Sequence, residues 1–502
     1  MPDQVLTSVT GVELTIALDA GTTGVRALAY DALALPLYEA YRELTQHFPR
    51  PGEVEHDALE IARLAVAVLD EVAQWSLASG HEVTAIGITN QRETVVCFDR
   101  EHGRVSGRAL VWQDRRGAAL CESLREAGHE ERVREVTGLV LDAYFSASKM
   151  HWLLDHGAAD ALDAPSLATI DAWLVWWLTG GVNGGVFATE ASNASRTLLF
   201  DLDAMTWSRP MRELFGVDLS MLPEVRPSGG NFGSVSAAVV PALAGVAITA
   251  VLGDQQAALF GQACFAPGAV KATYGTGAFV LANTGERRSS PVRGLLTTVA
   301  WDLGALGPVA YALEGSAFVA GAAVQWLRDE LGFVAHSSEL EALALSVPDS
   351  AGVQFVPAFT GLGSPFWDPD ARGAIVGLTR SSGRAHIARA LVEALAYQVR
   401  AITDAFEEGG VTLRELRADG GASMMNHLMQ LQASASRLTV RRSASLEATA
   451  RGAATLAGLA SGRWGSLEEL ESLWTLDESF APEDPLFVDL GYQAWLRATT
   501  VA

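Results

Sequence analysis

Apolar residues in this chain gather in short runs that are separated by glycine-rich turns. A run over residues 14–18 ends at Asp19, and a Gly-Thr-Thr-Gly turn leads from it into a second apolar run. This pattern predicts strand, turn and strand over residues 13–30. The same arrangement returns at residues 269–282, around the turn Gly275-Thr276-Gly277. We therefore expect each half of the chain to open with a similar hairpin, as an internal duplication would produce.

Between and after the two hairpins, strand-like runs alternate with segments of helical character. We predict strands over residues 83–89 and 248–252, and helices over residues 146–154, 171–178, 255–262, 317–330, 387–406 and 424–433. This alternation indicates an α/β fold with a separate sheet in each half. The longest apolar stretch, residues 237–253, is interrupted by Pro241 and Gly245. It falls short of the ~20 residues of a membrane-spanning helix, so we expect no membrane insertion.

The length of the chain indicates two domains. It has 502 residues, whereas a single hydrophobic core stops growing near ~250–300 residues. The junction is predicted at Gly253-Asp254, which gives domains over residues 1–253 and 254–502. Because no linker rich in proline or serine occurs there, we expect tightly joined domains with a cleft between them.

Charge and cysteine usage narrow the class of protein. The formal net charge is −23, whereas a nucleic-acid-binding protein needs basic residues to displace counterions from phosphates. The negative net charge would also repel the chain from an anionic membrane surface. Cys97, Cys121 and Cys264 cannot all pair within one chain and lack metal-ligand spacing, which favours buried thiols in a reducing compartment. Since the N-terminus has no signal-peptide pattern, we expect a cytoplasmic protein.

The two hairpins are candidates for phosphate binding. Glycine turns let backbone N–H groups approach phosphate oxygens, and the hydroxyls of Thr22 and Thr23 add donors. Asp19 ends the first strand, where it can hold a hydrated Mg²⁺, and Arg26 can offset phosphate charge. A plain hairpin, in which Asp and Thr only satisfy the turn, is the alternative for either hairpin alone. Two such hairpins facing each other across a cleft are what an ATP clamp requires.

Polar residues that follow the predicted strands form a candidate acceptor site. Arg92 and Glu93 offer donors and acceptors for vicinal hydroxyl groups, although an exposed ion pair is the commoner fate of such a dipeptide. Asp254 follows the strand over residues 248–252 and can accept the proton of a substrate hydroxyl during phosphoryl transfer. Its alternative role is that of a helix N-cap, and the two roles can coexist.

Glycines and aromatic residues add further candidates. Gly420-Gly421-Ala422 would allow close approach of a flat ligand such as adenosine, or would simply form a tight turn from strand to helix. Trp112, Tyr144 and Phe279 could wall a small pocket, although each alone is more often a core residue. The histidines lack metal-ligand spacing and are interpreted as structural or surface residues.

Together these motifs resemble the sugar kinase family that includes glycerol kinase, xylulokinase and gluconate kinase, within the actin-like ATPase superfamily. The phosphate hairpins are common to the whole superfamily. The runs at residues 90–94 and 253–261 are more specific, and they resemble the glycerol kinase branch. The other resembling segments are residues 17–23, 87–89, 111–116, 137–140, 144–146, 193–197, 273–277, 312–315, 359–363, 367–369 and 419–421.

The resemblance implies a fold, a reaction and a set of residue roles. The fold is α/β, with two ribonuclease H-like domains that close over the substrates and exclude water. The reaction is Mg²⁺-dependent transfer of the γ-phosphoryl group of ATP to glycerol, with Asp254 as general base. The residues implied to bind glycerol are Arg92, Glu93, Trp112, Tyr144, Asp254, Gln255 and Phe279. Those implied to bind ATP are Thr22, Thr23, Arg26, Thr276, Gly321, Gln325, Gly421 and Ala422, with Asp19 holding Mg²⁺ through water.

Some positions depart from the family pattern. Ala20, Ala143 and Met425 stand where the family has glutamine, proline and asparagine. Because the thioether of Met425 cannot replace the hydrogen bonds of an amide, Met425→Asn is expected to change the KM for the nucleotide more than that for glycerol. Residues 228–238 lack the loop through which fructose 1,6-bisphosphate inhibits bacterial relatives, so we expect no such inhibition.

Two alternatives to a glycerol kinase stay open at this point. One is a kinase for another polyol or keto-sugar, such as erythritol, xylulose or dihydroxyacetone, since one or two pocket contacts set this specificity. The other, from a different class, is a nucleotide-binding protein without kinase activity. The family also leads us to expect a homo-oligomer, either a dimer or a tetramer.

Overall fold

The computed structural model describes residues 11–483 and 485–502. The chain divides into two compact units, each of which is assembled from several stretches of sequence. Unit 1 comprises Met1–Ala263, Thr298–Tyr311 and Thr449–Leu473, and unit 2 comprises Cys264–Thr297, Ala312–Ala448 and Trp474–Ala502. These units are defined by packing rather than by a single cut in the chain. The expected domain boundary at Gly253-Asp254 therefore stays a prediction.

Unit 1 is built on a five-stranded sheet. Its strand order is β13 (Ala247–Gly253), β5 (Glu82–Asn90), β1 (Glu13–Ala20), β2 (Gly24–Tyr30) and β3 (Pro36–Glu43). The central strand β1 is antiparallel to β2 and parallel to β5, and β13 is parallel to β5. The hairpin predicted over residues 13–30 is thus confirmed as β1 and β2.

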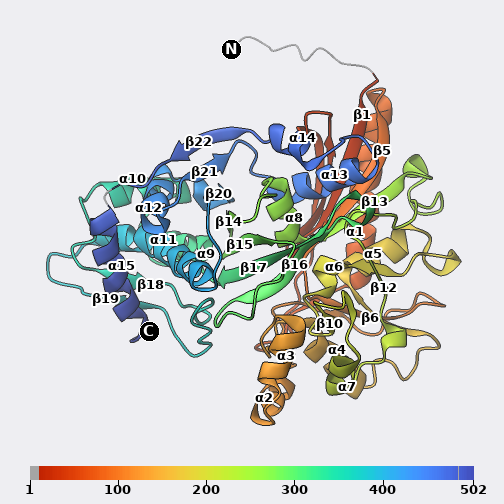
Figure 1. The fold of residues 1–502 in the computed structure, drawn as a ribbon, viewed down its shortest axis with the longest axis horizontal. Helices are drawn as coiled ribbons and strands as arrows, with labels where there is room; N and C mark the ends of the chain where they lie inside the picture. The colour runs from red at the N-terminus through yellow and green to blue at the C-terminus, as the bar shows by residue number, and fades with distance from the viewer. Residues whose placement is uncertain (1–10, 484) are drawn as a thin grey trace. The chain divides into compact units, whose positions relative to one another are not determined.

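Helices cover both faces of this sheet, and this explains why β1 reads as a nearly continuous apolar run. Leu14, Ile16 and Leu18 share a core cluster with residues of α1 (Ala58–Ala78) and α5 (Ile170–Leu178). Ala17 instead packs with residues of α13 (Ala448–Ala460). Side chains of a strand alternate between its two faces, so one strand serves two helical layers (Figure 1).

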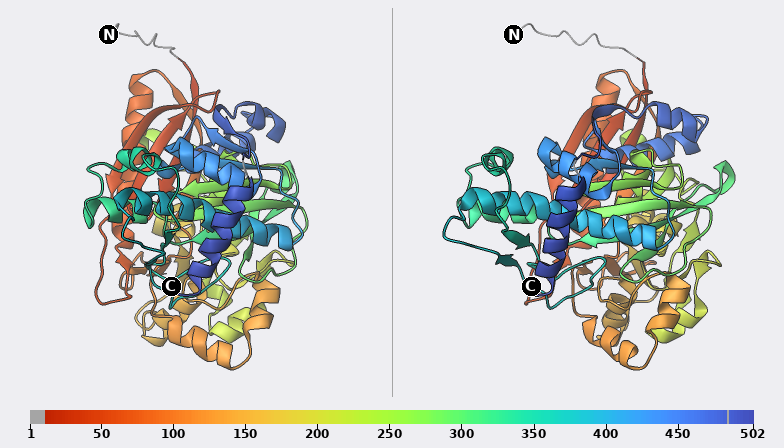
Figure 2. Two further views of the ribbon diagram at one scale, coloured as in Figure 1. Left: turned by 90° about the vertical axis from the view of Figure 1, so that its left-hand side faces the viewer. Right: turned by 60° about the vertical axis from the view of Figure 1, so that its left-hand side comes forward.

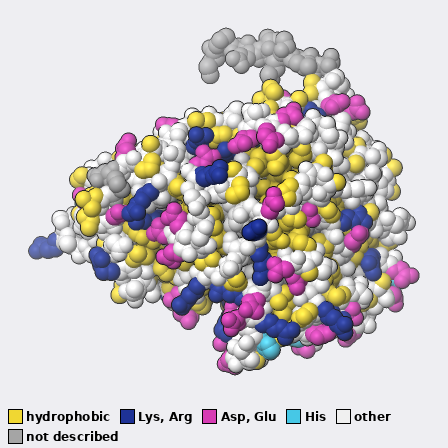
Figure 3. All heavy atoms as spheres, viewed as in Figure 1, with side chains coloured by type: hydrophobic (Ala, Val, Ile, Leu, Met, Phe, Trp, Pro, Cys, Tyr) yellow, Lys and Arg dark blue, Asp and Glu magenta, His cyan; other side chains and the backbone are white. Residues whose placement is uncertain are grey.

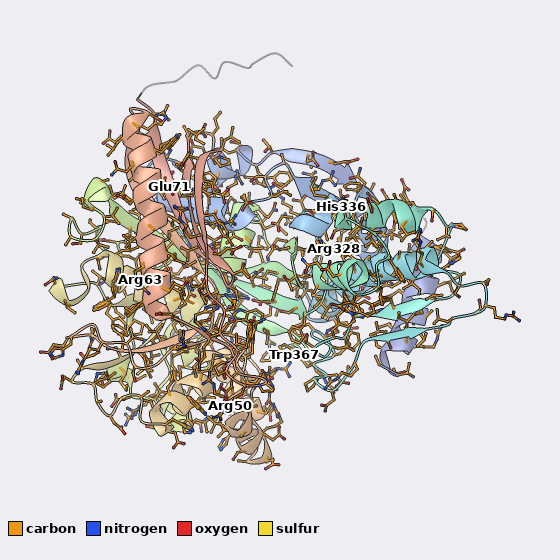
Figure 4. The ribbon with its side chains drawn as sticks, turned by 180° about the vertical axis from the view of Figure 1, so that it is seen from behind. Arg50, Arg63, Glu71, Arg328, His336 and Trp367 are labelled. Carbon is orange, nitrogen blue, oxygen red and sulfur yellow. The ribbon has the colours of Figure 1, made fainter. Side chains whose placement is uncertain are left out.

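The long helix α1 shows how the sequence sets these layers. Asp57 is its N-cap and accepts hydrogen bonds from the backbone N–H groups of Leu59 and Glu60. The face with Ile61 is buried, whereas Arg63 is exposed on the accessible side of the helix (Figure 4). A helix with one apolar face of this kind gains most of its stability from packing on a sheet.

The rest of unit 1 consists of smaller sheets and short helices. A four-stranded sheet has the order β4 (Glu55–His56), β7 (Ala109–Leu110), β6 (Val95–Asp99) and β8 (Pro165–Thr169). Two further pairs are β9 (Ala188–Glu190) with β12 (Glu224–Arg226), and β10 (Phe200–Asp201) with β11 (Thr206–Trp207). The remaining helices are α2 (Ala118–Glu126), α3 (Glu130–Thr137), α4 (Ser146–Asp155), α6 (Ala191–Ala194), α7 (Arg209–Phe215), α8 (Asp254–Gly261) and α14 (Leu467–Ser472).

Unit 2 is built around a seven-stranded sheet. The strand order is β16 (Leu296–Asp302), β17 (Val309–Ala317), β15 (Ala278–Gly285), β14 (Ala269–Tyr274), β20 (Glu415–Asp419), β21 (Val440–Ser443) and β22 (Leu476–Phe480). The division between the units passes through β16 and β17. A separate pair is β18 (Gln354–Val356) with β19 (Ala374–Val376), and the helices are α9 (Gly321–Asp329), α10 (Leu340–Leu345), α11 (Arg384–Glu408), α12 (Asn426–Ser436) and α15 (Pro485–Thr499).

The core of unit 2 lies between this sheet and its helices. Apolar residues of β14, β15 and β20 share one cluster with α11, α12 and α15. Figure 2 shows α15, in dark blue, running past the other helices of the unit to the C-terminus. The cluster is large enough for unit 2 to have a hydrophobic core of its own.

The internal duplication is confirmed by the order of the strands. In unit 1 the sheet that contains the first hairpin has the strand order β3, β2, β1, β5, β13. In unit 2 the five strands around the second hairpin follow the matching order β17, β15, β14, β20, β21. In both sheets the first strand of the hairpin is antiparallel to its partner and parallel to the strand on its other side. The predicted α/β fold with a ribonuclease H-like sheet in each half is therefore confirmed.

The predicted helices are confirmed, with three corrections at their starts. The helix expected from residue 387 begins earlier, at Arg384. The helix expected from residue 317 begins at Gly321, because Ala317 is still the last residue of β17. The helix expected from residue 424 begins at Asn426, after a short 3₁₀ turn. Alanine and methionine both favour a helix, so their intrinsic preference predicts an earlier start than the tertiary contacts allow. All three cysteines lie buried, as predicted.

Throughout the described residues, every helix is too short or too polar to cross a membrane.

Candidate functional site

The ends of two neighbouring parallel strands bring the predicted acceptor residues together. β5 and β13 end side by side, with Asn90 opposite Gly253, so that Arg92 and Asp254 leave the same edge of the sheet. The Arg92 Nε atom lies 3.0 Å from Asp254 Oδ1. A Cβ atom at Gly253 would lie 2.8 Å from Arg92 Cδ. Glycine at this position therefore leaves the space that the arginine side chain occupies.

Burial distinguishes this pair from an ordinary surface ion pair. Arg92 is 3% exposed and Glu93 is 2% exposed, so the alternative of an exposed Arg-Glu dipeptide is wrong. Arg92 Nη1 also donates to Gln256 Oε1 at 3.2 Å. A buried guanidinium with two directional partners has a fixed orientation, which a substrate-binding cation needs.

Asp254 occupies the first position of α8 rather than the cap. The N-cap is Gly253, so the alternative of Asp254 as N-cap is wrong. Its Oδ1 atom accepts the backbone N–H of Gln255 at 2.6 Å, and negative charge is favourable at a helix N-terminus. The Asp254 side chain is 30% exposed. The carboxylate is thus oriented by protein donors while a ligand hydroxyl can still reach it.

Glu93 has an unusual backbone that its surroundings hold in place. Its φ is 60°, in the left-handed region that residues other than glycine seldom adopt. Arg196 Nε donates to Glu93 Oε1 at 2.7 Å, and Ser146 Oγ donates to the Glu93 carbonyl at 3.1 Å. Backbone strain of this kind persists where neighbouring contacts over-determine it, and it is frequent at functional sites.

Aromatic side chains connect the acceptor residues to the first hairpin. The rings of Trp112 and Tyr144 meet edge to face at 5.5 Å. The indole Nε1 of Trp112 donates to Thr22 Oγ1 at 3.0 Å. Trp112 therefore contacts one residue predicted to bind glycerol and one predicted to bind ATP, all within unit 1.

Several side chains hold the first hairpin. Gln91 Nε2 donates to the Gly21 carbonyl at 3.0 Å, and Gln46 Nε2 donates to the Thr22 carbonyl at 2.7 Å. The ring of His56 lies between these two amides, with its Nε2 2.9 Å from Gln46 Oε1 and its Nδ1 3.3 Å from Gln91 Nε2. Burial lowers the pKa of His56 to about 4, so the ring is neutral at pH 7. This agrees with the structural role expected of the histidines.

Asp19 offers a donor of the kind that Mg²⁺ prefers. It is 7% exposed, at the end of β1, and its Oδ2 accepts Arg26 Nε at 2.9 Å. Mg²⁺ commonly uses one or two carboxylates, several waters and substrate phosphates, and one carboxylate beside a glycine turn fits that requirement. Another acidic group, Asp99 with His102 and Asp163, is already occupied by Arg104, which contacts both aspartates.

The predicted nucleotide residues of unit 2 lie at strand ends and at a helix start. The Gly321 N–H, at the start of α9, donates to the Gly275 carbonyl at 2.9 Å, and the Thr276 carbonyl accepts the N–H of Ala320 at 2.8 Å. Gly421 and Ala422 lie in the turn after β20, which runs parallel to β14. Thr276 and Gly421 are exposed. The structure thus brings Thr276 and Gly321 close together through backbone hydrogen bonds that each makes with a neighbour of the other.

Three other positions in unit 2 are less closely tied to this group. Gln325 lies on α9 with its side chain exposed, and Phe279 lies on β15 opposite Thr273. Met425 is 8% exposed and belongs to the apolar core. The roles of Gln325 and Phe279, and the effect of Met425 on nucleotide binding, stay predictions.

A buried carboxyl group, that of Glu190, is linked through Ser192 to Gly253 beside the predicted acceptor residues. The sequence did not predict this contact. Glu190 accepts hydrogen bonds from the hydroxyls of Ser192 and Ser228, and Ser192 Oγ in turn accepts the N–H of Gly253 at 3.0 Å. Burial raises the pKa of Glu190 to about 7. Arg196 and Lys149 were missed as well. The segment at residues 193–197 was recognised as a motif, but nothing in it indicated which atoms Arg196 would contact.

Comparison with known proteins decides the family. Residues 14–261 match the FGGY family of carbohydrate kinases, N-terminal domain, and residues 270–461 match its C-terminal domain. The chain belongs to the FGGY family of carbohydrate kinases.

Relatives within the FGGY family are similar over nearly the whole chain. A glycerol kinase of Halorhodospira halophila is 51% identical over 89% of this chain and 88% of its own. One of Acidovorax ebreus is 49% identical over 94% and 95%. The crystal structure of Plasmodium falciparum glycerol kinase with ADP matches with a TM-score of 0.91 and 33% identity, over 98% of both chains. The FGGY fold and its division into two parts thus extend along this chain.

Proposed function

We propose that this FGGY kinase phosphorylates glycerol, transferring the γ-phosphoryl group of ATP to a terminal hydroxyl. The observation that carries the proposal is the buried Arg92, which holds the Asp254 carboxylate at 3.0 Å, in a chain that is 49% and 51% identical to two relatives named glycerol kinases. A non-catalytic nucleotide-binding protein has no use for such a pair, and membership of a kinase family also argues against that alternative.

In the proposed reaction, Asp254 acts as general base. One of its carboxylate oxygens accepts the proton of the glycerol hydroxyl while the hydroxyl oxygen forms a bond to the γ-phosphorus. The bond between this phosphorus and the bridging oxygen to the β-phosphate breaks, and ADP leaves with that electron pair. Arg92 and Glu93, with Tyr144 and Gln255, bind the remaining hydroxyls, while Trp112 and Phe279 contact the carbon chain. Since these side chains are oriented by the protein, the acceptor loses little further freedom on reaching the reactive geometry.

The nucleotide roles follow the two hairpins. Thr22, Thr23 and Arg26 in unit 1, and Thr276 and Gly321 in unit 2, offer donors to the phosphates. Asp19 would hold Mg²⁺ through water, and the ion would neutralise charge that develops on the phosphates. A cytoplasmic location, expected from the buried free thiols, and a homo-oligomeric assembly, expected from the family, belong to the same proposal.

The test is ADP release from Mg-ATP by the purified chain with glycerol, dihydroxyacetone, erythritol, xylulose or no acceptor. Preference for glycerol is expected. Asp254→Asn should reduce turnover with glycerol by about 1000-fold or more, because removal of a general base and its charge removes transition-state stabilisation. Nucleotide binding by calorimetry should persist. Asp57→Asn, which replaces one good N-cap by another, is the matched control and should keep wild-type turnover.

The outcomes separate three conclusions. A preference for another acceptor would retain the kinase and reject glycerol as its substrate. Near-normal turnover of Asp254→Asn would reject Asp254 as base. Turnover that is independent of every acceptor would reject the proposed transfer reaction altogether.

A further inference from the structure

Two cations are buried behind the predicted acceptor site, and the proposed mechanism uses neither of them. Arg196 and Lys149 are both 0% exposed. Fully buried arginine and lysine side chains are rare because removing their charge from water is unfavourable unless specific partners compensate for it. The contacts of these two side chains therefore indicate what their burial achieves.

Arg196 contacts both walls of the acceptor site. Its Nε donates to Glu93 Oε1 at 2.7 Å. Its guanidinium carbon also lies 5.6 Å from the centre of the Tyr144 ring and 5.1 Å from that of Phe145. A planar guanidinium can pair with a carboxylate and face aromatic rings at the same time, which an ammonium group cannot do equally well.

Lys149 holds the backbone that carries Tyr144. Its Nζ donates to three consecutive carbonyl oxygens, those of Ala143 at 2.8 Å, Tyr144 at 2.6 Å and Phe145 at 3.1 Å. A lysine ammonium has three donors, so all of them are used on this one turn. Burial lowers the pKa of Lys149 to about 8, and at pH 7 the side chain still carries most of its charge.

The two cations thus act on the same pair of residues from different sides. Glu93 is held through its carboxylate by Arg196 and through its carbonyl by Ser146. Tyr144 is held through its ring by Arg196 and through its backbone by Lys149. Glu93 has a left-handed backbone conformation, and without these contacts it would relax toward a commoner one.

We propose that Arg196 and Lys149 are positioning residues of the acceptor site, which fix Glu93 and Tyr144 in the arrangement that selects a small polyol. This inference rests on the proposed function. Neither cation needs to touch the substrate, because each acts through a side chain or carbonyl group that it holds. The nucleotide residues of unit 2 have no part in the inference, so nucleotide affinity serves as an internal reference.

The experiment measures the KM for glycerol and kcat at saturating Mg-ATP, with nucleotide affinity by calorimetry and a melting curve for each full-length variant. Arg196→Met should lower kcat/KM for glycerol by about 100-fold, since Glu93 then lies buried without its cation. Arg196→Lys should raise the KM by about 10-fold because the planar fork is lost. Lys149→Met should also raise it by about 10-fold, with partial rescue in Lys149→Arg. Nucleotide affinity should stay within about twofold throughout.

A matched control separates positioning from general stability. Arg389 and Glu393 form a buried pair of similar geometry in unit 2, with Nε 2.8 Å from Oε1. Arg389→Met should lower the melting temperature as Arg196→Met does, but should leave the KM for glycerol unchanged. A double variant of Arg196→Met with Glu93→Gln should lose less than the sum of the single losses, because Arg196 acts through Glu93.

The measured KM values decide whether Arg196 and Lys149 position the acceptor site. If wild type turns over glycerol while Arg196→Met and Arg196→Lys keep its KM within about twofold, the inference is overturned. Fully additive losses in the double variant would overturn it as well. If Arg196→Met does not fold, Arg196→Lys decides by the same criterion. A wild-type chain without glycerol-dependent turnover overturns the proposed function, and the inference with it.

Discussion

The two hairpins occupy the same place in two sheets of the same strand order, yet they are held in different ways. In unit 1, side chains hold the turn: Gln46 and Gln91 donate to its carbonyls, and Trp112 donates to Thr22. In unit 2, backbone groups hold the turn, and the N–H groups of Ala320 and Gly321 donate to the carbonyls of Thr276 and Gly275. A duplicated backbone has therefore kept its topology while its supporting contacts diverged.

The two sheets also carry an aspartate on different strands next to the hairpin turn. In unit 1, Asp19 is the last but one residue of the hairpin strand and lies opposite Thr89. In unit 2, Thr273 is the last but one residue of the hairpin strand and lies opposite Asp419. The two positions have thus exchanged an acid and a hydroxyl, and only the first hairpin carries the acid on its own strand. The difference suggests that the first hairpin provides the metal-binding group and the second mainly provides backbone donors.

The largest effect should follow from removing the acid that belongs to the first hairpin. Asp19→Asn is expected to lower kcat by about 1000-fold, since the proposed Mg²⁺, which would compensate phosphate charge, would lose the carboxylate that holds its water shell. The measurement is kcat as a function of Mg²⁺ concentration, and excess Mg²⁺ should restore part of the activity. An unchanged dependence on Mg²⁺ would mean that Asp19 serves only to pair with Arg26.

The second effect tests whether the backbone of the second hairpin tolerates a side chain. A Cβ at Gly321 would lie 2.6 Å from the Gly275 carbonyl oxygen, so Gly321→Ala should cost about 2–3 kcal/mol of stability through this overlap. The KM for the nucleotide should rise with it. A Cβ at Gly421 meets no atom within 4 Å, and Gly421→Ala should therefore keep the wild-type melting temperature. Equal destabilisation by both changes would contradict the steric explanation.

The third prediction uses the pH dependence of stability to test the side chains around His56 that hold the first hairpin. Burial lowers the pKa of His56 to about 4, below its usual value near ~6.5. The unfolded chain then binds the proton first, so the contribution of His56 to stability is present above pH ~6.5 and is lost as the pH falls toward 4. At pH 5 the loss should be about 2 kcal/mol.

Chemical denaturation of wild type and His56→Asn at pH 7 and pH 5 measures this loss. The variant should lose less stability on acidification than wild type, by about the same 2 kcal/mol. Glu190 works in the opposite direction, because its raised pKa makes its contribution fall as the pH rises from ~4.5 to 7, but both proteins share that term. Identical losses in the two proteins would exclude His56 as the titrating group.

The smallest effect concerns the contact between acceptor site and hairpin. Trp112→Phe keeps an aromatic ring near Tyr144 but removes the donor to Thr22. The KM for the nucleotide should rise about fivefold, corresponding to one neutral hydrogen bond of ~1 kcal/mol. The KM for glycerol should change less. The reverse order would show that the indole serves mainly the acceptor.

Much of the fold could be predicted because its signals are local. Turn glycines and apolar runs located β1, β2, β14 and β15, and the repeat of the pattern indicated the duplication. The starts of α9 and α12 were misplaced, since Ala317 and Met425 are good helix formers and the tertiary contacts override this preference.

The acceptor site was less predictable because its supporting contacts join distant parts of the chain. Arg92 and Asp254 could be proposed because each follows a strand end and lies in a recognisable motif. The pairing of Arg196 with Glu93 spans 103 positions in sequence, and no local pattern encodes such a contact. An exposed ion pair was the alternative for the dipeptide of Arg92 and Glu93, whereas both residues are buried and contact different partners inside the unit.

The burial of Lys149 has a consequence for the surface of the protein. The sequence contains one other lysine, Lys271, and it is also 0% exposed, so the dark blue side chains visible in Figure 3 are arginines. Reagents that acylate or crosslink primary amines would meet no accessible side-chain target on the folded chain, and lysine acetylation or ubiquitin attachment would need prior unfolding. Amine labelling of lysine side chains followed by mass spectrometry therefore reports the opening of the structure around Lys149 and around Lys271 in β14, without background from other lysines.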